Sequence, residues 1–300
     1  MTTLRQLRYL EAIARHSHFG KAAAECAVSQ PALSQQIKAL EESWGVALLE
    51  RSPKQVSLTP QGEEAVRRAR AILTAVSDLE DCARERASTL SGVLRLGAIP
   101  SIAPYLLPNL LTKLTSVYPD LDLRLREAVT ETLVDELKAG RLDVIVAALP
   151  LTFPELEVRA LFDDRFLLAL RDDKSMEPNR KASMDMIEDD RLLLMGEGHC
   201  LREQVLNFCN IGSAKLSRAL GASSLSTIMQ MVANGHGVTL LPEMCINGQT
   251  VDQRIKLLQF AGLQPARTVA MAWRKSTPLR DDYVALSGLL FDRDMGEARQ

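Results

Sequence analysis

The sequence of 300 residues lacks a long apolar run. No stretch approaches the roughly 20 apolar residues that a transmembrane helix needs. The first ten residues carry Arg5 and Arg8, and no apolar core follows them, so we expect no signal peptide. We therefore expect a cytoplasmic protein with no membrane partner.

The cysteines and histidines lack the spacings of disulfide frameworks and metal sites. The number of cysteines, five, is odd, and no Cys-x-x-Cys motif is present. The four histidines show no metal-binding spacing. In a reducing compartment all five cysteines are expected to be free thiols, and we expect neither a metal nor another cofactor. Three of them are expected to be small buried hydrophobes, namely Cys26, Cys82 and Cys245.

The chain also lacks an excess of positive charge. Its net charge is −2 and its isoelectric point is about 6.2, which counts weakly against nucleic-acid binding because such proteins usually carry a basic field. Residues 1–60, however, hold seven Lys and Arg residues against five Asp and Glu residues. A small, slightly basic domain attached to a larger acidic one is compatible with both observations.

The first ninety residues show helical periodicity, and two neighbouring helices have the pattern of a helix-turn-helix. A short alanine-rich helix at 19–27 precedes a longer one at 29–44, for which Ser29 is a good N-cap and Gly45 a stop. The paired hydrophobic residues of 46–58 favour a short β-wing. The second helix carries polar side chains that can read base edges: Gln30, Ser34, Gln35 and Lys38.

Several motifs in this region fall in one register. They are Ala22-Ala23-Ala24, Val28-Ser29-Gln30-Pro31-Ala32-Leu33-Ser34, Leu48-Leu49-Glu50-Arg51 and Leu58-Thr59-Pro60-Gln61-Gly62. In this combination the segment resembles the winged helix-turn-helix of LysR-type transcriptional regulators. The resemblance implies that residues 1–58 bind double-stranded DNA, that Ser29 and Pro31 belong to the DNA-binding residues, and that Arg51 contacts phosphate. The competing interpretation is an ordinary helical bundle with a glutamine-rich face.

A long helix is expected to follow, with Thr59 as its cap and Pro60 in its first turn. Its apolar stripe alternates spacings of three and four residues, as in a coiled coil, and such a helix needs a partner. The stripe consists of Val66, Ala69, Leu73, Val76, Leu79/Glu80 and Ala83. The simplest partner is a second copy of the chain, so we expect residues 59–90 to be a dimerising linker.

Beyond the linker, strands and helices alternate. They are expected in turn at 93–99, 105–118, 121–127, 132–139 and 142–149, and the same pattern returns with a strand at 165–170. The nearly continuous apolar run of 142–149 is typical of a strand buried in a parallel sheet. This β-α-β-α-β order predicts an α/β fold over 91–300, and the whole chain is expected to be an α+β multidomain protein. The family resemblance implies a regulatory domain like type 2 periplasmic binding proteins, with subdomains at about 91–163 plus 267–300 and at about 164–266.

Two cysteines, Cys200 and Cys209, differ from the others in their neighbours. His199 and Arg202 can bring positive charge near the Cys200 sulfur, which favours the thiolate. If a helix begins after Gly198, its N-terminus favours the thiolate further. An accessible thiolate reacts with peroxide to give a sulfenic acid, and a second thiol condenses with that group to form a disulfide.

The spacing of these two cysteines sets a mechanical condition. Nine residues of helix rise about 13.5 Å, whereas a disulfide requires Cα atoms within about 7 Å. If the segment from Cys200 to Cys209 is helical, the bond requires the segment to unwind. Such an element has two states, and a covalent event selects between them.

The surroundings of both cysteines resemble the hydrogen-peroxide sensors of the same regulator family. The matching strings include Gly198-His199-Cys200-Leu201-Arg202, Phe208-Cys209, Pro104-Tyr105-Leu106-Leu107-Pro108 and Pro278-Leu279-Arg280. The resemblance covers nearly the whole chain, and it implies that Cys200 is the peroxidatic thiol and Cys209 the resolving thiol. It also implies a peroxide pocket lined by Ser101, Thr130, His199, Arg202 and Arg267.

Two positions depart from the pattern of these sensors. Ser101 stands where threonine is usual, which keeps the hydroxyl and loses a methyl group. Glu203 stands where aspartate is common. Neither change is expected to abolish function.

Three functions are compatible with these patterns. The first is a peroxide-sensing activator of transcription, not an enzyme, switched by a Cys200–Cys209 disulfide. It would act as a homodimer or homotetramer, with RNA polymerase and a thiol reductant as further partners. The second is a regulator of the same fold that binds a small organic effector between its subdomains, which gives no reason for two thiols at this spacing. The third is a thiol peroxidase fused to DNA-binding helices, for which no recycling motif is present. We favour the first.

Overall fold

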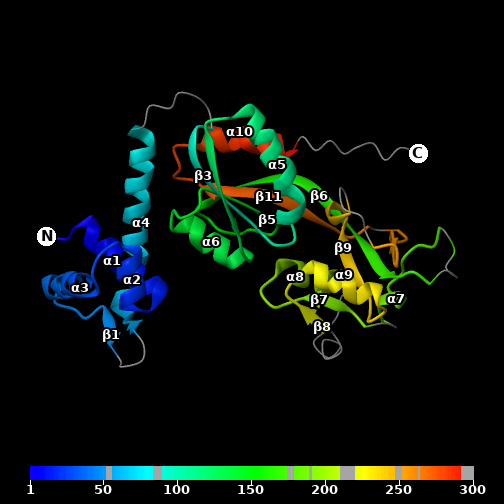
Figure 1. Cartoon of the computed structure of the whole chain (residues 1–300), viewed down its shortest axis with the longest axis horizontal. Coiled ribbons are helices and arrows are strands. Elements are labelled where there is room, and N and C mark those ends of the chain that lie inside the picture. Colours follow the sequence, from blue (N-terminus) through cyan, green and yellow to red (C-terminus); the bar gives the residue numbers. More distant parts are fainter. Residues whose placement is uncertain are drawn as a thin grey trace. The chain divides into compact units, whose positions relative to one another are not determined.

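The computed structural model describes residues 1–51, 56–83, 90–173, 177, 179–188, 191–209, 220–246, 252–262 and 264–291. The chain divides into a smaller, mostly helical N-terminal unit and a larger C-terminal α/β unit (Figure 1). The tip of the expected wing at 52–55 and the end of the expected linker at 84–89 lie outside the described residues. Within the described part of the chain, every helix is too short or too polar to span a bilayer.

Three helices pack around the apolar core of the N-terminal unit. They are α1 (Leu4–His16), α2 (Phe19–Glu25) and α3 (Gln30–Trp44). Leu33, Ile37 and Leu40 form the buried stripe of α3. Ser29 caps α3 by accepting a hydrogen bond from the backbone of the third helical residue, and Gly45 ends it in the left-handed conformation. The structure thus confirms the predicted helix-turn-helix.

A short wing and a long helix complete this unit. The wing consists of the antiparallel strands β1 (Leu49–Arg51) and β2 (Val56–Leu58), as predicted. Helix α4 (Pro60–Ala83) follows directly. The Thr59 hydroxyl accepts the Gly62 N–H at 3.0 Å, so Thr59 caps α4 in the way that the sequence predicts.

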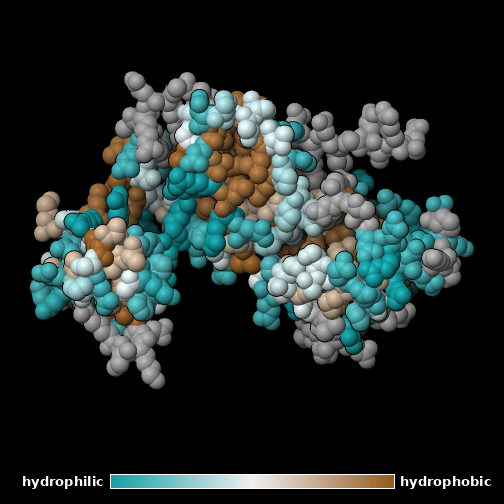
Figure 2. All heavy atoms as spheres, in the orientation of Figure 1, coloured by the Kyte–Doolittle hydropathy of each residue, from teal (hydrophilic) through white to brown (hydrophobic). Residues whose placement is uncertain are grey.

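Only part of the apolar stripe of α4 is left for a partner. Val66 is buried in the core that α4 shares with the other helices, and Ala69 is buried as well. Ile72 and Leu79 are 46% and 68% exposed, and Figure 2 shows apolar atoms along this helix. Treating the whole stripe as a partner surface was therefore wrong for its first half, because α4 uses those residues to pack on its own chain. Cys82, expected to be buried, is exposed on α4.

The C-terminal unit is organised around a sheet that has seven strands within the described residues. These strands are β3 (Gly92–Ala98), β4 (Leu121–Glu127), β5 (Val144–Ala148), β6 (Leu156–Arg171), β9 (Thr239–Pro242), β10 (Ile255–Leu258) and β11 (Ala266–Arg274). Their order is β10-β6-β11-β5-β3-β4, with β9 also paired to β6. Strand β3 is parallel to both β4 and β5, and β5 is entirely buried, as predicted.

Helices connect these strands in the predicted β-α-β-α-β order. Helix α5 (Ala103–Val117) joins β3 to β4, and α6 (Thr130–Lys138) joins β4 to β5. The remaining elements are α7 (Asp185–Glu188), β7 (Leu193–Met195), α8 (Cys200–Cys209), β8 (Leu220–Ala222), α9 (Leu225–Ala233), the 3-10 helix η2 (Glu243–Cys245) and α10 (Arg280–Phe291). Strands β7 and β8 pair in parallel, and α8 and α9 lie beside them (Figure 1).

The long strand β6 links two parts of the C-terminal unit. Up to Arg165 it pairs with β11, and from Phe166 onward it pairs with β9 and then β10. The sequence pattern predicted this strand only over 165–170, and its predicted start was wrong because β6 begins at Leu156. The half that begins at Leu156 mixes buried and half-exposed positions without strict alternation, so periodicity alone does not reveal it.

The ring of His18 caps α2, a role that the sequence pattern did not indicate. Its Nδ1 accepts the N–H groups of Gly20 at 3.0 Å and Lys21 at 3.2 Å. Loss of an N-cap costs about 1 kcal/mol, so we expect His18→Ala to speed amide exchange in α2 about fivefold. His18→Asn keeps an acceptor and should exchange like the natural chain. Hydrogen–deuterium exchange with peptide resolution measures both, and equal exchange in the two variants would contradict the capping role.

Candidate functional site

The predicted base-reading residues form one accessible face of α3. Gln30, Gln35 and Lys38 are exposed, and Ser34 is half-buried between them. Positions three and four apart lie on one side of a helix, so these side chains can enter a groove together. Lys38 lies 3.7 Å from Glu42 in a solvent-exposed pair, which restrains it little.

The other predicted DNA-binding residues have different structural roles. The Ser29 hydroxyl accepts the Ala32 N–H at 3.4 Å, so it caps α3, while Pro31 occupies the first turn and is exposed. Arg51 is the last residue of β1 and pairs with Val56 through the backbone, whereas its side chain lies outside the described atoms. Ser29 and Pro31 therefore fix where the recognition helix begins.

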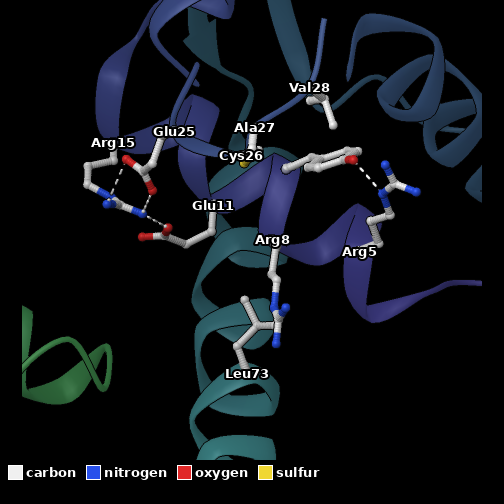
Figure 3. Close-up of a pocket in the computed structure, with 10 residues that line it drawn as sticks. Arg5, Arg8, Glu11, Arg15, Glu25, Cys26, Ala27, Val28 and Leu73 are labelled. Atoms are coloured by element: carbon white, nitrogen blue, oxygen red, sulfur yellow. Dashed lines mark hydrogen bonds and ion pairs between the residues drawn. The ribbon is translucent and has the colours of Figure 1, made fainter. Parts of the chain in front are cut away.

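A cavity of about 580 Å³ lies among α1, α2 and α4 in the same unit (Figure 3). The charged groups at one end of it are paired, because Arg15 contacts both Glu11 and Glu25. Burial and the nearby Glu25 carboxylate raise the pKa of the Cys26 thiol, so Cys26 is a weak nucleophile here. The residues described as lining this cavity include none of those predicted to contact DNA.

In the C-terminal unit, one helix carries the predicted redox pair. Cys200 is the first residue of α8 and Cys209 the last, and both are free thiols. Gly198, at φ +84°, makes the left-handed turn that precedes the helix. Nine helical steps separate the two Cα atoms by about 13.5 Å and turn them about 180° around the axis. Since a disulfide requires about 7 Å, these cysteines cannot bond while α8 is intact.

The two thiols have unlike surroundings. Cys200 is half-buried at the start of α8, whereas Cys209 packs in the apolar core and is 6% exposed. Burial raises the pKa of the Cys209 thiol to about 11. Cys209 is therefore protonated and shielded for as long as α8 stays folded.

His199 and Arg202, which were expected to bring positive charge to Cys200, have other environments in the structure. Burial lowers the pKa of His199, so its ring is neutral at pH 7. Arg202 lies two residues along α8, a spacing at which helical side chains do not face each other, and its guanidinium donates to the Met195 carbonyl at 3.3 Å. The remaining positive end beside Cys200 is that of the α8 dipole, because Cys200 is the first residue of the helix.

The predicted hydroxyl residues meet at one edge of the large sheet. Ser101 follows β3, Thr130 follows β4, and Leu149 follows β5. Because these three strands are parallel neighbours, their carboxyl ends share an edge. Such an edge is where open α/β sheets place their ligand sites.

Helix α8 contacts this carboxyl edge. The Gln204 amide donates to the Leu149 carbonyl at 3.3 Å. Gln204 stands four residues after Cys200, so both side chains project from one face of α8. The Cys200 face therefore lies toward the strand ends that carry Ser101 and Thr130.

Two buried polar atoms in this region have no hydrogen-bond partner among the described residues. They are the Thr130 hydroxyl oxygen and Gln204 Oε1. Buried polar groups are nearly always hydrogen-bonded, so both atoms suit a small polar ligand. Sequence reasoning identified Thr130 and missed Gln204, although its position one helical turn after Cys200 is a usable signal.

Two of the predicted pocket residues, Arg267 and Ser101, are hydrogen-bonded to each other. The Arg267 guanidinium is buried, and its Nη1 donates to the Ser101 hydroxyl at 2.8 Å. Its Nε donates to Asp164 Oδ2 at 3.0 Å, which neutralises the buried cation. Sequence reasoning missed Asp164, because its place opposite Arg267 follows from the register of β6 and β11.

The raised pKa of Cys209 makes a measurable prediction. At pH 7.5 a thiol of pKa about 11 is ionised about 300-fold less than one of pKa about 8.5. We expect iodoacetamide to label Cys209 at least about 300-fold more slowly in the folded protein than in guanidinium. The folded rate should rise about tenfold per pH unit, because the thiolate fraction does. Timed alkylation with peptide mapping measures this, and a pH-independent or equal rate contradicts it.

Comparison with known proteins identifies both parts of the chain. Residues 4–63 match the family described as "Bacterial regulatory helix-turn-helix protein, lysR family". Residues 87–292 match the family described as "LysR substrate binding domain". Together with the elements above, these matches confirm the predicted fold class of a winged helix-turn-helix followed by an α/β regulatory domain.

Individual relatives match over nearly their full length. A "Probable hydrogen peroxide-inducible genes activator" from Streptomyces viridosporus is 41% identical over 290 residues, 96% of this chain and 93% of that protein. The "HTH-type transcriptional regulator EstR" from Acinetobacter baylyi is 39% identical over 294 residues, covering 97% and 96%. A solved full-length OxyR variant from Pseudomonas aeruginosa is 37% identical, with a TM-score of 0.79 and coverage of 97% and 95%. The chain therefore belongs to the LysR family of bacterial helix-turn-helix transcriptional regulators.

Proposed function

We propose that this regulator senses hydrogen peroxide through Cys200 and is switched by a Cys200–Cys209 disulfide. The main support is that the two cysteines are the first and last residues of α8. In addition, the face of α8 that carries Cys200 lies toward the polar carboxyl edge of the sheet. The relative from Streptomyces viridosporus is named for peroxide-inducible genes, which agrees with this assignment.

The chemistry begins at the Cys200 sulfur. The thiolate attacks one oxygen of hydrogen peroxide, so that an S–O bond forms as the O–O bond breaks. The departing hydroxide takes up a proton and becomes water. The product is a Cys200 sulfenic acid, in which the sulfur has lost two electrons and the peroxide has gained them.

The second step couples chemistry to conformation. Cys209 attacks the sulfenic sulfur, an S–S bond forms, and a second water leaves. The Cα atoms of the two cysteines are about 13.5 Å apart, and the Cys209 thiol is buried and protonated. This step therefore requires α8 to unwind. The disulfide then holds the unwound state until a thiol reductant, a proposed partner, reduces it.

A competing function is a regulator that responds to a small organic effector. Overall similarity does not exclude it, because EstR, whose name does not mention peroxide, matches this chain at 39% identity. The two cysteines at the ends of α8 are what favour the peroxide switch, since an effector site has no use for a thiol pair that cannot bond in the folded helix.

We further propose that the chain binds double-stranded DNA through α3 as a self-associated activator that works with RNA polymerase. Two separate apolar surfaces suit a homodimer or homotetramer. One is the outer face of α4 with Ile72 and Leu79; the other lies near β3 and α5, where Figure 2 shows apolar atoms and where Val93, Leu111 and Val117 are exposed. Sedimentation of the full chain as a monomer at micromolar concentration would refute self-association.

The switch is tested by peptide mapping after thiol alkylation. We expect micromolar peroxide to convert Cys200 and Cys209 to an intramolecular disulfide and to change the DNA footprint. Cys200→Ser should keep DNA affinity and lose the response. The matched control is Cys82→Ser, which removes an exposed thiol from α4 and should respond normally. If Cys200 and Cys209 stay alkylatable after peroxide, the proposed function is wrong.

The DNA contacts are tested separately on α3. Gln30→Ala should lose about 1–3 kcal/mol at the one base pair it reads, and so relax sequence preference there. Arg51→Ala is the comparison, because Arg51 is predicted to contact phosphate, and loss of a phosphate contact weakens binding on all sequences alike. Binding to a panel of singly substituted operators distinguishes the two patterns. A uniform loss for Gln30→Ala would reassign it as a phosphate contact.

A further inference from the structure

A buried ion pair lies where β6 changes its pairing partner. Asp164 of β6 and Arg267 of β11 are directly opposite in the strand register. Their side chains are 0% and 1% exposed, so each charge depends on the other for compensation. Neither chemical step described above uses Asp164.

Both oxygens of Asp164 are engaged. Oδ2 accepts Nε of Arg267 at 3.0 Å, and Oδ1 accepts the backbone N–H of Met244 at 2.9 Å. Three separate segments, β6, β11 and η2, therefore hold this carboxylate in one orientation. In turn, the carboxylate holds the Nε edge of the guanidinium.

The planar guanidinium transmits that orientation to Ser101. With Nε fixed, the positions of the two Nη groups in the same plane are fixed as well. Nη1 donates to the Ser101 hydroxyl at 2.8 Å, and Nη2 donates to the Ser101 carbonyl at 3.1 Å. Arg267 thus holds both polar groups of Ser101, which is itself 3% exposed.

This contact makes the Ser101 hydroxyl oxygen an acceptor and leaves its hydrogen for another partner. A serine hydroxyl has one hydrogen to donate, and an arginine in a protein is always a donor. The Ser101 oxygen must therefore accept from Arg267, and its own hydrogen must point to another atom. Ser101 follows β3 at the carboxyl edge toward which the Cys200 face of α8 lies.

We infer that Asp164 is a positioning residue which, through Arg267, fixes the Ser101 hydroxyl as a hydrogen-bond donor to the peroxide oxygen that departs from Cys200. This inference rests on the proposed function. As the O–O bond breaks, negative charge develops on the departing oxygen, and a preoriented donor stabilises it. Without Asp164, the guanidinium is free to turn and the hydroxyl loses its fixed direction.

The test compares two reagents on the full-length chain. Asp164→Asn keeps the shape and the acceptor for Met244 N–H while removing the charge. We expect it to slow peroxide oxidation of Cys200 about 10- to 100-fold. Alkylation of Cys200 by iodoacetamide forms no charged oxygen, so its rate should stay within about twofold. Timed peptide mapping gives both rates.

A matched control stands next to Asp164 on the same strand. Asp163 accepts a hydrogen bond from the exposed Thr268 hydroxyl at 2.7 Å and does not contact Arg267 in the described structure. Asp163→Asn should leave both rates unchanged. Equal slowing of peroxide oxidation in Asp163→Asn and Asp164→Asn would overturn the assignment.

A double-variant comparison separates positioning from simple destabilisation. Ser101→Ala should slow peroxide oxidation, and Asp164→Asn should add no further slowing in that background, because both changes remove the same donor. Additive slowing, or a normal rate in Ser101→Ala, would overturn the inference. If Asp164→Asn does not fold, Asp164→Leu combined with Arg267→Met removes both charges and should give the same non-additive result.

Failure of this inference is distinguishable from failure of the proposed function. If the natural chain does not react with peroxide at Cys200, the proposed function fails. If it reacts and Asp164→Asn reacts equally fast, only the positioning role of Asp164 fails.

Discussion

The helical geometry of α8 is the constraint on which the proposed switch depends. A regular helix keeps Cys200 and Cys209 about 13.5 Å apart and on opposite sides of its axis. The backbone hydrogen bonds of the helix therefore maintain the distance between the two proposed redox cysteines. The apolar core adds to this separation by burying Cys209 and keeping it protonated. In the proposed switch, oxidation of Cys200 leads to a disulfide only when α8 unwinds, which couples the reaction at one sulfur to a change in a packed helix.

The reactive end of α8 owes its surroundings to the large sheet. Parallel pairing of β3 with β4 and β5 brings Ser101, Thr130 and Leu149 to one edge from three distant parts of the chain. Gln204 attaches α8 to that edge. The long strand β6 then supplies Asp164, which compensates Arg267 and so allows a cation to sit beside Ser101 in the interior. Burial lowers the pKa of His199, so its ring carries no charge at neutral pH.

The N-terminal unit shows the opposite balance between local and distant interactions. Its helices begin and end through short-range bonds, such as those of Ser29 and Thr59, so their bounds follow closely from neighbouring residues. The base-reading face of α3 is the solvent side of a helix whose other side, with Leu33 and Ile37, is buried. Local sequence signals are enough to predict these helices, because each predicted DNA-contacting side chain of α3 lies within a few turns of the cap that fixes the start of the helix.

By itself the sequence predicted most of the elements and the family, and it indicated the proposed thiol pair, since helical periodicity, caps and the motif around Cys200 are local signals. It also indicated Ser101, Thr130 and Arg267 through resemblance. Only the tertiary structure showed that the N-terminal core buries the first half of the apolar stripe of α4. It also showed that β6 begins at Leu156 and that Asp164 lies opposite Arg267. It also showed that Arg202 donates to the Met195 carbonyl and that His199 is half-buried. The physical reason is that burial and strand register depend on residues far apart in the sequence, such as Asp164 and Arg267, whose distances no local pattern encodes.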